Sequence, residues 1–400
     1  MEKIVIVGGG QASAWAAQTL RKEGFEGAIH VVSNEKDIFY ERPPLSKQNL
    51  LEEMDSEALS FFPQEAVESW HLNLHLNCNA TAIDTNIQIV YLDSGESLSY
   101  DKLLLATGSS ARVLNPAWHE LDGVYTLRNL EQSHLLREKL KGIKRLVVIG
   151  GGWIGLEVAA SAAQLGLQVT VLEVGPHVCG RSISPEISEL LHAIHREEGV
   201  DIMTLCGTIE LQQAADGGVE IHLDHKLWEI ADIVLVAAGA QINTALAKEA
   251  GLDVSDGIVV NEYCQSSHDN IYAAGDVAIH PELGFSMQSW AHAQNQGIAA
   301  AKHMLGKEEP YKDIPWLWSD QYDCNIQILG TPIMGGKRVI RDSGARKKSY
   351  FYFDENDVLR YVVAVNEPRN IKIAKRWMQR QTNLDLQAIS DVDVNLMTIK

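Results

Sequence analysis

Ile4-Val5-Ile6-Val7-Gly8-Gly9-Gly10-Gln11-Ala12-Ser13 is the stretch that decides the fold. Four apolar residues predict a buried strand, three glycines predict a tight turn, and an alanine-rich helix is expected from Ala12 to Leu20. This is the setting of the G-x-G-x-x-[GA] motif, in which a pyrophosphate meets the backbone of the turn and the positive end of the helix dipole. The third small position is Ser13, which still permits close packing of helix on strand. The alternative is a glycine-rich turn with a purely structural role.

An acidic side chain about 20 residues after such glycines usually binds a ribose hydroxyl. The second strand is expected at Ala28–Val32 and ends at Ser33-Asn34-Glu35. Glu35 is the candidate acid, and Asn34 is a neutral neighbour that could also bond the sugar. The alternative for Glu35 is a solvated position in a loop.

The opening pattern returns at Val147-Val148-Ile149-Gly150-Gly151-Gly152-Trp153-Ile154-Gly155, now with a complete G-x-G-x-x-G. A helix is expected through Glu157 to Leu165, and the strand Gln168–Glu173 follows with an acid at its end. Glu173 favours a free ribose 2′-hydroxyl and therefore NAD over NADP. A 2′-phosphate would need a nearby arginine, and Arg181 lies a little further along, so NADP stays open.

Each of the two motifs is followed by a buried closing strand with a small-residue turn. The first is Leu103–Gly108, the second is Ile233–Gly239, and a further strand at Asn270–Ala273 runs into Gly275-Asp276. Two complete motifs, each with an acid and a closing strand, are a far more specific signal for nucleotide binding than one.

A proline-containing segment, Tyr40-Glu41-Arg42-Pro43-Pro44-Leu45-Ser46-Lys47, lies between the motifs. Proline fixes φ, so the pair of prolines predicts a rigid extended turn with Arg42 and Lys47 held at its two ends. A lysine in such a loop is ordinarily only solvated.

The composition excludes several classes of protein. The chain has 400 residues, enough for two or three domains, and its formal net charge of −19 argues against nucleic acid as a partner. No apolar run approaches the length of a transmembrane helix, and glycines interrupt the run that would otherwise resemble a signal peptide. Histidine pairs at 71/75, 192/195 and 222/225 lack a third ligand, so no metal site is expected.

The five cysteines are scattered along the chain, at Cys78, Cys179, Cys206, Cys264 and Cys324. None forms a C-x-x-C or C-x4-C pair. This distribution fits the reducing cytoplasm and argues against a disulfide redox centre.

The sequence changes character from about residue 309. Alternating strands are expected, beginning with Trp316-Leu317-Trp318-Ser319-Asp320-Gln321-Tyr322, and a helix is expected near 370–380. Residues 331–400 hold 13 basic and 8 acidic residues although the whole chain is acidic. Six basic residues lie close together: Lys337, Arg338, Arg341, Arg346, Lys347 and Lys348. They form either a solvated basic face or a docking surface that steers an acidic protein.

Together these motifs resemble those of a known family. The motifs that carry the resemblance are Val7–Gly10, Glu41–Lys47, Ala106-Thr107-Gly108, Gly150–Glu157, Ala274-Gly275-Asp276-Val277 and Trp316–Tyr322. They look like those of the FAD-dependent ferredoxin reductase components that serve bacterial aromatic-ring dioxygenases, with the putidaredoxin and rubredoxin reductases as relatives. The resemblance covers nearly the whole chain.

The resemblance implies an α/β fold with two Rossmann-like domains of the glutathione-reductase type and a C-terminal α+β domain. Residues 1–110 and 240–309 would form a discontinuous FAD-binding domain, and residues 111–239 would form the NAD-binding domain. Residues 310–400 would form the C-terminal domain, with an interface for ferredoxin docking.

The resemblance also implies the residues of the two nucleotide sites. FAD would be held by Gly8, Gly10, Ala12, Ser13, Asn34, Glu35, Arg42, Lys47, Ala80, Thr107, Gly108, Arg128, Gly275, Asp276 and Trp290. NAD would be held by Gly150, Gly152, Ile154, Gly155, Glu157, Glu173 and Gly239.

Within these sets the resemblance gives three residues a catalytic part. Lys47 would lie beside the flavin and pair with Glu157, and Trp290 would lie against the stacked flavin and nicotinamide rings. Asp276 would bond the ribityl chain. Many relatives carry an acid where this chain has Asn34, which gives Glu35 more weight.

The implied activity is transfer of hydride from NADH to FAD, followed by single-electron transfer to a [2Fe–2S] ferredoxin. The ferredoxin would feed an aromatic-ring-hydroxylating dioxygenase acting on phenylpropionate or cinnamate. The alternatives are a rubredoxin- or putidaredoxin-type reductase for a monooxygenase, an NADH oxidase, and an NADH-sensing flavoprotein. An oxidase of this kind typically needs a reactive cysteine early in the chain, and none precedes Cys78.

Overall fold

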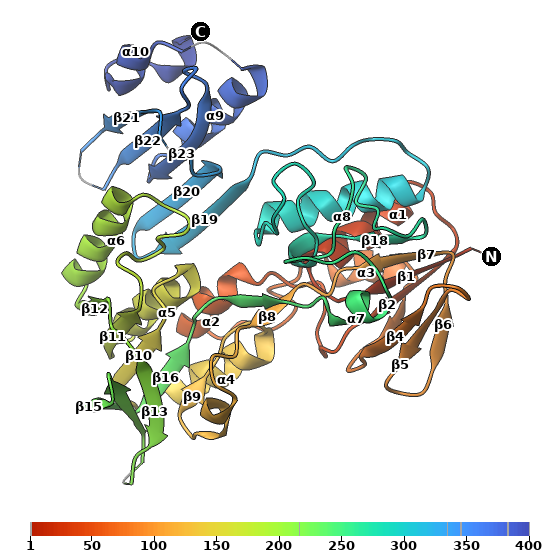
Figure 1. Ribbon diagram of the computed structural model, residues 1–400, viewed down its shortest axis with the longest axis horizontal. Coiled ribbons are helices and arrows are strands. Elements are labelled where there is room, and N and C mark those ends of the chain that lie inside the picture. Colours follow the sequence, from red (N-terminus) through yellow and green to blue (C-terminus); the bar gives the residue numbers. More distant parts are fainter. Residues whose placement is uncertain (1, 216, 334, 345, 382–383, 400) are drawn as a thin grey trace. The chain divides into compact units, whose positions relative to one another are not determined.

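The computed structural model describes residues 2–215, 217–333, 335–344, 346–381 and 384–399. The chain divides into two compact units (Figure 1). The first comprises Met1–Arg42, Met54–Ser110 and Ala240–Asp313, and the second comprises Pro43–Glu53, Ala111–Gly239 and Ile314–Lys400. The segment 43–53 therefore groups with residues 111–239, and so do the residues after 313.

The first unit is built on a parallel sheet with strand order β18-β7-β1-β2-β3. Its strands are β1 (Lys3–Val7), β2 (Ala28–Val32), β3 (Asn73–His75), β7 (Lys102–Leu105) and β18 (Ile271–Ala273). Helices α1 (Gln11–Lys22) and α8 (Trp290–Met304) lie side by side against the sheet (Figure 1). An antiparallel sheet of β4 (Ala80–Asp84), β5 (Ile89–Leu92) and β6 (Ser97–Ser99) completes this unit with the short helices α3 (Gln64–Ser69) and α7 (Ala245–Glu249).

Burial of both sheet faces explains the continuous apolar run of the opening strand. Ile4 and Ile6 pack in the core that contains α1 and α8, whereas Val5 and Val7 pack in the core that contains β4, β5 and β6. Alternate residues of a strand point to opposite faces, so a strand covered on both sides needs apolar residues at every position.

The second unit contains another parallel sheet, with strand order β12-β11-β10-β16-β9. The strands are β9 (Val124–Tyr125), β10 (Arg145–Ile149), β11 (Gln168–Glu173), β12 (Val200–Thr204) and β16 (Ile233–Val236). The helices are α2 (Gln48–Leu51), α4 (Leu130–Leu140), α5 (Trp153–Gln164) and α6 (Pro185–Glu197). A three-stranded antiparallel sheet consists of β13 (Ile209–Gln213), β14 (Val219–Leu223) and β15 (Lys226–Ala231).

The chain after residue 313 adds an antiparallel sheet with order β19-β20-β23-β22-β21. The elements are β19 (Trp316–Gln321), β20 (Cys324–Gly330), β21 (Lys337–Asp342), β22 (Lys348–Phe353), β23 (Leu359–Val365), α9 (Pro368–Arg380) and α10 (Leu386–Ser390). Phe351 and Val362 pack against Ala374 and Trp377 of α9. The predicted α/β class is confirmed, as are the strands and the helix expected in this region.

The remaining elements are short. They are the 3₁₀ turns η1 (Pro43–Ser46), η2 (Pro116–Glu120), η3 (Gly275–Val277) and η4 (Leu396–Thr398), and the paired strands β8 (Ser109–Ala111) and β17 (Ala240–Ile242). The prediction of an extended turn at the two prolines was wrong, because η1 is helical there. A φ near −65° suits a 3₁₀ turn as well as an extended segment, so the prolines alone do not decide between them.

Candidate functional site: two nucleotide cradles and a buried ion pair

The first glycine-rich turn follows β1 in the first unit. Gly8 has a φ of +126°, and a β-carbon there would lie 2.1 Å from the carbonyl oxygen of Ala106. Gly10 differs, because the nearest atom that a β-carbon there would meet in the described part of the chain, its sequence neighbours aside, is an Arg42 guanidinium nitrogen at 4.0 Å. Gly10 is also the N-cap of α1, and no side chain caps that helix. The accessible backbone of the turn, the first N–H groups of α1 and the Arg42 guanidinium therefore lie close together. These are the groups that bind a pyrophosphate at the start of a helix.

Close helix packing explains the small residues beside this turn. A β-carbon on Gly275 would lie 3.1 Å from that of Ala12, and one on Gly297 would lie 2.4 Å from the Ala12 carbonyl oxygen. The Gly275 N–H is bound by the Gln296 side chain at 2.8 Å, and the Gln11 amide donates to the Trp290 carbonyl at 3.0 Å. The start of α1, the turn η3 and the first turn of α8 are thereby held together.

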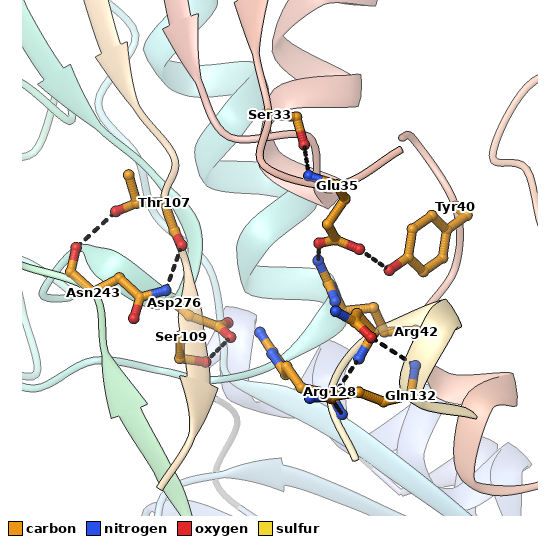
Figure 2. A network of polar contacts seen from close by, with 11 residues as sticks. Ser33, Glu35, Tyr40, Arg42, Thr107, Ser109, Arg128, Gln132, Asn243 and Asp276 are labelled. Atoms are coloured by element: carbon orange, nitrogen blue, oxygen red, sulfur yellow. Dashed lines mark hydrogen bonds and ion pairs between the residues drawn. The ribbon is translucent and has the colours of Figure 1, made fainter. Parts of the chain in front are cut away.

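Asp276 and the Thr107-Gly108 turn lie at the same end of this sheet. Asp276 accepts a hydrogen bond from the Ser109 hydroxyl at 2.8 Å (Figure 2). Asn243 donates to the Thr107 carbonyl at 2.9 Å, and the Thr107 hydroxyl donates to the Asn243 carbonyl at 2.8 Å. Sequence reasoning missed Asn243, because no motif marks it and its contacts span more than a hundred residues.

The Glu35 carboxylate is bound by neighbouring side chains and is not simply solvated. Its carboxylate lies 2.6 Å from the Arg42 guanidinium and accepts a hydrogen bond from the Tyr40 hydroxyl (Figure 2). Asn34, in contrast, is exposed, and Ala80 is half-buried at the start of β4. Glu35 and Arg42 therefore form an ion pair beside the first glycine turn.

The second glycine-rich turn, after β10, repeats this arrangement in the second unit. Gly150 has a φ of +112°, and a β-carbon there would lie 2.5 Å from the Ala237 carbonyl oxygen. A β-carbon on Gly155 would lie 2.1 Å from the Gly150 carbonyl oxygen. A β-carbon on Gly152, the N-cap of α5, would meet no atom of the described residues within 4 Å, its sequence neighbours and the backbone of α5 aside. Ile154 in the first turn of α5 is exposed. Gly150 and Gly155 thus permit close packing, and Gly152 leaves the open face.

Glu173 at the end of β11 is tied to this turn. One carboxylate oxygen accepts from the Gly151 N–H at 2.8 Å, and the other accepts from the Gly175 N–H at 2.6 Å. The Arg181 guanidinium lies 3.5 Å from where a β-carbon of Gly239 would stand. The acid is therefore held beside the glycine turn by direct hydrogen bonds, in the place where an acid binds the ribose in this motif.

The predicted pairing of Lys47 with Glu157 is confirmed. The ammonium lies 3.0 Å from the Glu157 carboxylate, and both side chains are buried. The Ser46 hydroxyl donates to the second carboxylate oxygen at 2.5 Å, and Ser319 of β19 donates to the first at 2.6 Å. A charge buried this deeply is stable only when it is paired and hydrogen-bonded, and Glu157 has three such partners.

Further hydrogen bonds hold the Lys47 segment in place. The Ser161 hydroxyl of α5 donates to the Ser46 carbonyl at 2.9 Å, and the Ser133 hydroxyl of α4 donates to the Leu45 carbonyl at 2.7 Å. Arg128 precedes α4, and its backbone N–H donates to the Gln132 side chain at 2.7 Å. The bonds from Ser161 and Ser133 explain why residues 43–53 belong to the second unit.

The basic cluster of the C-terminal region is largely neutralised within the chain. Lys337 pairs with Asp357, Arg338 with Glu186 and Lys348 with Asp342, while Arg346 contacts Glu197, Glu198 and Asp323. Arg341 is buried and donates to backbone carbonyls at 389, 391, 392 and 394. The interpretation of this cluster as a free basic docking surface is therefore not supported, because five of its six cations have partners.

All five cysteines are free and buried in the part of the chain that the structure describes. Burial raises the pKa of each thiol, for example that of Cys324 to about 11. Among the described residues no group of three or more His, Cys, Asp or Glu could hold a metal ion. No helix in the described ranges is both long and apolar enough to cross a membrane.

Comparison with protein families identifies the class of this chain. The family model described as pyridine nucleotide-disulphide oxidoreductase matches residues 2–297, and the one described as reductase C-terminal matches residues 316–400. The chain belongs to the pyridine nucleotide-disulphide oxidoreductase family. The predicted fold of two nucleotide-binding domains and a reductase C-terminal domain is thereby confirmed.

Individual relatives narrow the class. The chain is 36% identical, over 99% of both chains, to the ferredoxin–NAD(+) reductase component of the anthranilate 1,2-dioxygenase system of Burkholderia cepacia. It is 34% identical to that of the p-cumate 2,3-dioxygenase system of Pseudomonas putida, over 99% of this chain and 98% of that one. Within its family it belongs with these ferredoxin–NAD(+) reductase components.

Solved structures agree with this placement. The chain is similar to putidaredoxin reductase in its covalent complex with putidaredoxin, with a TM-score of 0.93 and 33% identity over 99% of this chain and 97% of that one. It is also similar to the ferredoxin reductase of the CYP199A2 system from Rhodopseudomonas palustris, with a TM-score of 0.93 and 31% identity over 99% of both chains.

Substitutions at two glycines of the second turn should distinguish an effect on nucleotide binding from an effect on folding. We expect Gly152→Ala to keep the melting temperature of the wild type but to weaken NADH binding at least tenfold, because the new methyl group enters the open face of the turn. Gly155→Ala should instead lower the melting temperature, because its β-carbon would collide with the Gly150 carbonyl. Calorimetry of unfolding and of NADH binding measures both effects, and equal affinity of Gly152→Ala and wild type would contradict the assignment.

The buried pair should show strong coupling in stability. Lys47→Met and Glu157→Gln should each cost about 3–5 kcal/mol, because each leaves one group without its main partner. The double variant should lose less than the sum of the two. Urea unfolding of the four proteins measures the coupling, and Lys141→Met, which breaks an exposed pair with Glu138, should leave the midpoint unchanged. Additive losses would show that the two side chains do not support each other.

His292 in the first turn of α8 should make stability depend on pH. Burial lowers its pKa to about 4, and its Nδ1 lies 2.8 Å from the Tyr311 hydroxyl. The unfolded chain then binds the proton more readily, so stability falls as pH drops from about 6.5 to about 4, by up to about 3 kcal/mol. Urea midpoints measured between pH 7.5 and 4.5 should fall less steeply for His292→Gln than for wild type, and parallel curves would contradict this assignment.

Proposed function

We propose that this chain is an FAD-dependent enzyme that takes electrons from NADH and passes them singly to a [2Fe–2S] ferredoxin of an aromatic-ring dioxygenase system. The observation that carries the proposal is the pair of glycine-rich cradles, one in each unit, each with an open third glycine at the start of a helix. Two dinucleotides bound by one chain are what hydride transfer between a nicotinamide and a flavin requires.

The first cradle fits the FAD pyrophosphate. Gly10 leaves the backbone accessible, Arg42 supplies a cation beside it, and Glu35 offers carboxylate oxygen for the ribose. Asp276 stands at the start of η3 and would bond the ribityl chain, with Ser109 as its partner. Bound FAD would accept a hydride and release its electrons one at a time.

The second cradle fits NADH. Glu173 is fixed beside the turn by two backbone N–H groups, so its position does not depend on the ligand. A carboxylate held there favours a ribose hydroxyl over a 2′-phosphate, which it would repel. This supports NADH as the donor over NADPH.

Lys47 and Glu157 would set the charge near the reacting rings. A buried ammonium that is preorganised by its carboxylate partner can stabilise negative charge that develops on a reduced flavin, without reorganisation during the reaction. Trp290, the first residue of α8, is the candidate for contact with the flavin and nicotinamide rings. The stacked rings of Trp316 and Trp318, 5.0 Å apart, are candidates for a place near the flavin edge.

The cysteines support an external electron acceptor. Enzymes that reduce a bound disulfide or a peroxide use a reactive thiolate, whereas burial here raises the pKa of every thiol. This supports a protein partner as the acceptor of the electrons. A relative of this chain has been seen in complex with putidaredoxin, and other relatives serve dioxygenase systems. For the aromatic substrate of the system we propose phenylpropionate or cinnamate.

The second candidate is a reductase for a monooxygenase, which the likeness to the CYP199A2-system reductase favours.

In either case an acidic partner would need a basic surface on the C-terminal domain, which we take as residues 310–400. Helix α9 carries five basic residues and no acidic one, and four of the five are exposed: Arg369, Lys372, Arg376 and Arg380. This face, rather than the neutralised cluster at 337–348, would steer a ferredoxin.

Electron transfer from NADH tests the proposal. The purified protein should carry FAD, or take it up, and should reduce cytochrome c with NADH much faster when a dioxygenase [2Fe–2S] ferredoxin is added. NADPH should be a poorer donor. A monooxygenase-type ferredoxin as the better acceptor would favour the second candidate. Protein that cannot bind flavin, or NADH oxidation that ferredoxin does not stimulate, would overturn the assignment.

A further inference from the structure

The Glu157 carboxylate is the end of a longer row of buried hydrogen bonds. Ser319, which donates to Glu157, accepts a hydrogen bond from the Gln321 amide at 3.0 Å. The Gln321 carbonyl lies 2.8 Å from His195 Nε2, and His195 Nδ1 lies 3.1 Å from the Tyr322 hydroxyl. These residues come from β19, from the turn after it and from α6, and all of them belong to the second unit.

The row has a single direction. Since Gln321 presents its carbonyl oxygen to His195, Nε2 must carry the imidazole proton, and Nδ1 must accept from Tyr322. Every donor therefore points along the row toward Glu157: phenol, imidazole, amide and hydroxyl. Ser319, Gln321 and His195 are each at most 2% exposed, so water does not compete for these bonds.

The protonation states along the row agree with this direction. Burial is the main cause that lowers the pKa of His195, which therefore stays neutral with one N–H. Burial also raises the pKa of Tyr322, which stays a phenol. The titratable or charged groups that face these two are His192, Glu198 and Arg346. Cys179 faces Glu157 as a thiol whose pKa burial raises.

We propose that Ser319, Gln321 and His195 are positioning residues that hold the Glu157 carboxylate, and through it the Lys47 ammonium, in the orientation used for electron transfer. The inference rests on the proposed function for the meaning of Lys47. The row does not conduct protons, because an amide does not readily take up and release one, and Gln321 stands in its middle. Its effect is to fix geometry: the oxygen of Glu157 that contacts Lys47 is also the one that Ser319 binds.

The alternation of β19 supports this assignment. Ser319 and Gln321 point to the buried side, whereas Trp318 and Asp320 lie on the other face and bond to each other at 3.1 Å. Each buried polar group of the row has a hydrogen-bond partner. A group without one would destabilise the fold, so a fully paired polar row points to a role beyond packing.

Variants of Ser319 and His195 test the proposal, with folding checked by thermal unfolding. Ser319→Ala should lower kcat for NADH-dependent cytochrome c reduction about tenfold, and His195→Phe about threefold, with little change in the KM for NADH. Ser319→Thr keeps the hydroxyl and should restore wild-type kcat. His192→Phe, one turn earlier on α6 and outside the row, is the matched control.

A second readout does not depend on flavin. NMR of ¹⁵N-labelled protein should show a slowly exchanging Lys47 ammonium signal, assigned by its loss in Lys47→Met, because the buried carboxylate shields it from water. The signal should persist in Ser319→Thr and His192→Phe and should broaden or vanish in Ser319→Ala and His195→Phe. In wild type, ¹⁵N shifts should also report the Nε2–H form of His195.

The outcomes separate the two proposals. If wild type binds no flavin, the proposed function fails, and the row is judged by the Lys47 signal alone. If wild type is an active reductase but His195→Phe and Ser319→Ala match His192→Phe in kcat and in the Lys47 signal, the positioning role is overturned while the function stands.

Discussion

The contacts of the buried Glu157 carboxylate are the interaction on which the assembly of the second unit depends. Glu157 lies in the helix that begins with the second glycine turn, and its three partners come from segments far apart in the chain: Ser46 and Lys47 from one, and Ser319 from the other. A buried carboxylate without these donors would be strongly unfavourable, so the three segments must assemble together. One charged group thereby couples the nucleotide turn to the proline segment and to the first strand of the C-terminal domain.

The same physical rule produces the two cradles. In each, a strand buried on both faces is followed by a glycine with positive φ, whose β-carbon would collide with a neighbouring carbonyl, and two residues later by a glycine whose β-carbon would meet open space. The first glycine is required by packing and the second by access to the backbone. The differences lie in the acids: Glu173 is bonded by backbone N–H groups, whereas Glu35 is bonded by the side chains of Arg42 and Tyr40. The position of Glu173 is therefore fixed by the backbone around its own turn. The position of Glu35 depends on the segment that leads into the two prolines.

Local sequence patterns predicted what is local in this structure. The strands, the glycine turns and the pair of motifs could be recognised because each is encoded within about ten residues, and the partnership of Lys47 with Glu157 came from the family resemblance. What could not be predicted depends on contacts between distant segments. Asn243 closes the Thr107 turn, and His195 reaches Gln321, but neither residue stands in a pattern of its own. The basic cluster shows the same limit. Its residues stand together in the sequence, but the sequence does not show that Arg338 and Arg346 pair with carboxylates of α6 and of the residue after it.

The Trp316–Tyr322 segment shows how one strand can serve two purposes. Its period of two gives one face to Ser319 and Gln321, which reach the buried pair, and the other to Trp316 and Trp318, whose rings stack. A substitution that shifted the register of β19 by one residue would exchange these faces, removing a donor from Glu157 and burying an indole in its place. The hydrogen bonds of Ser319 and Gln321 therefore fix the tryptophan face as well as the carboxylate.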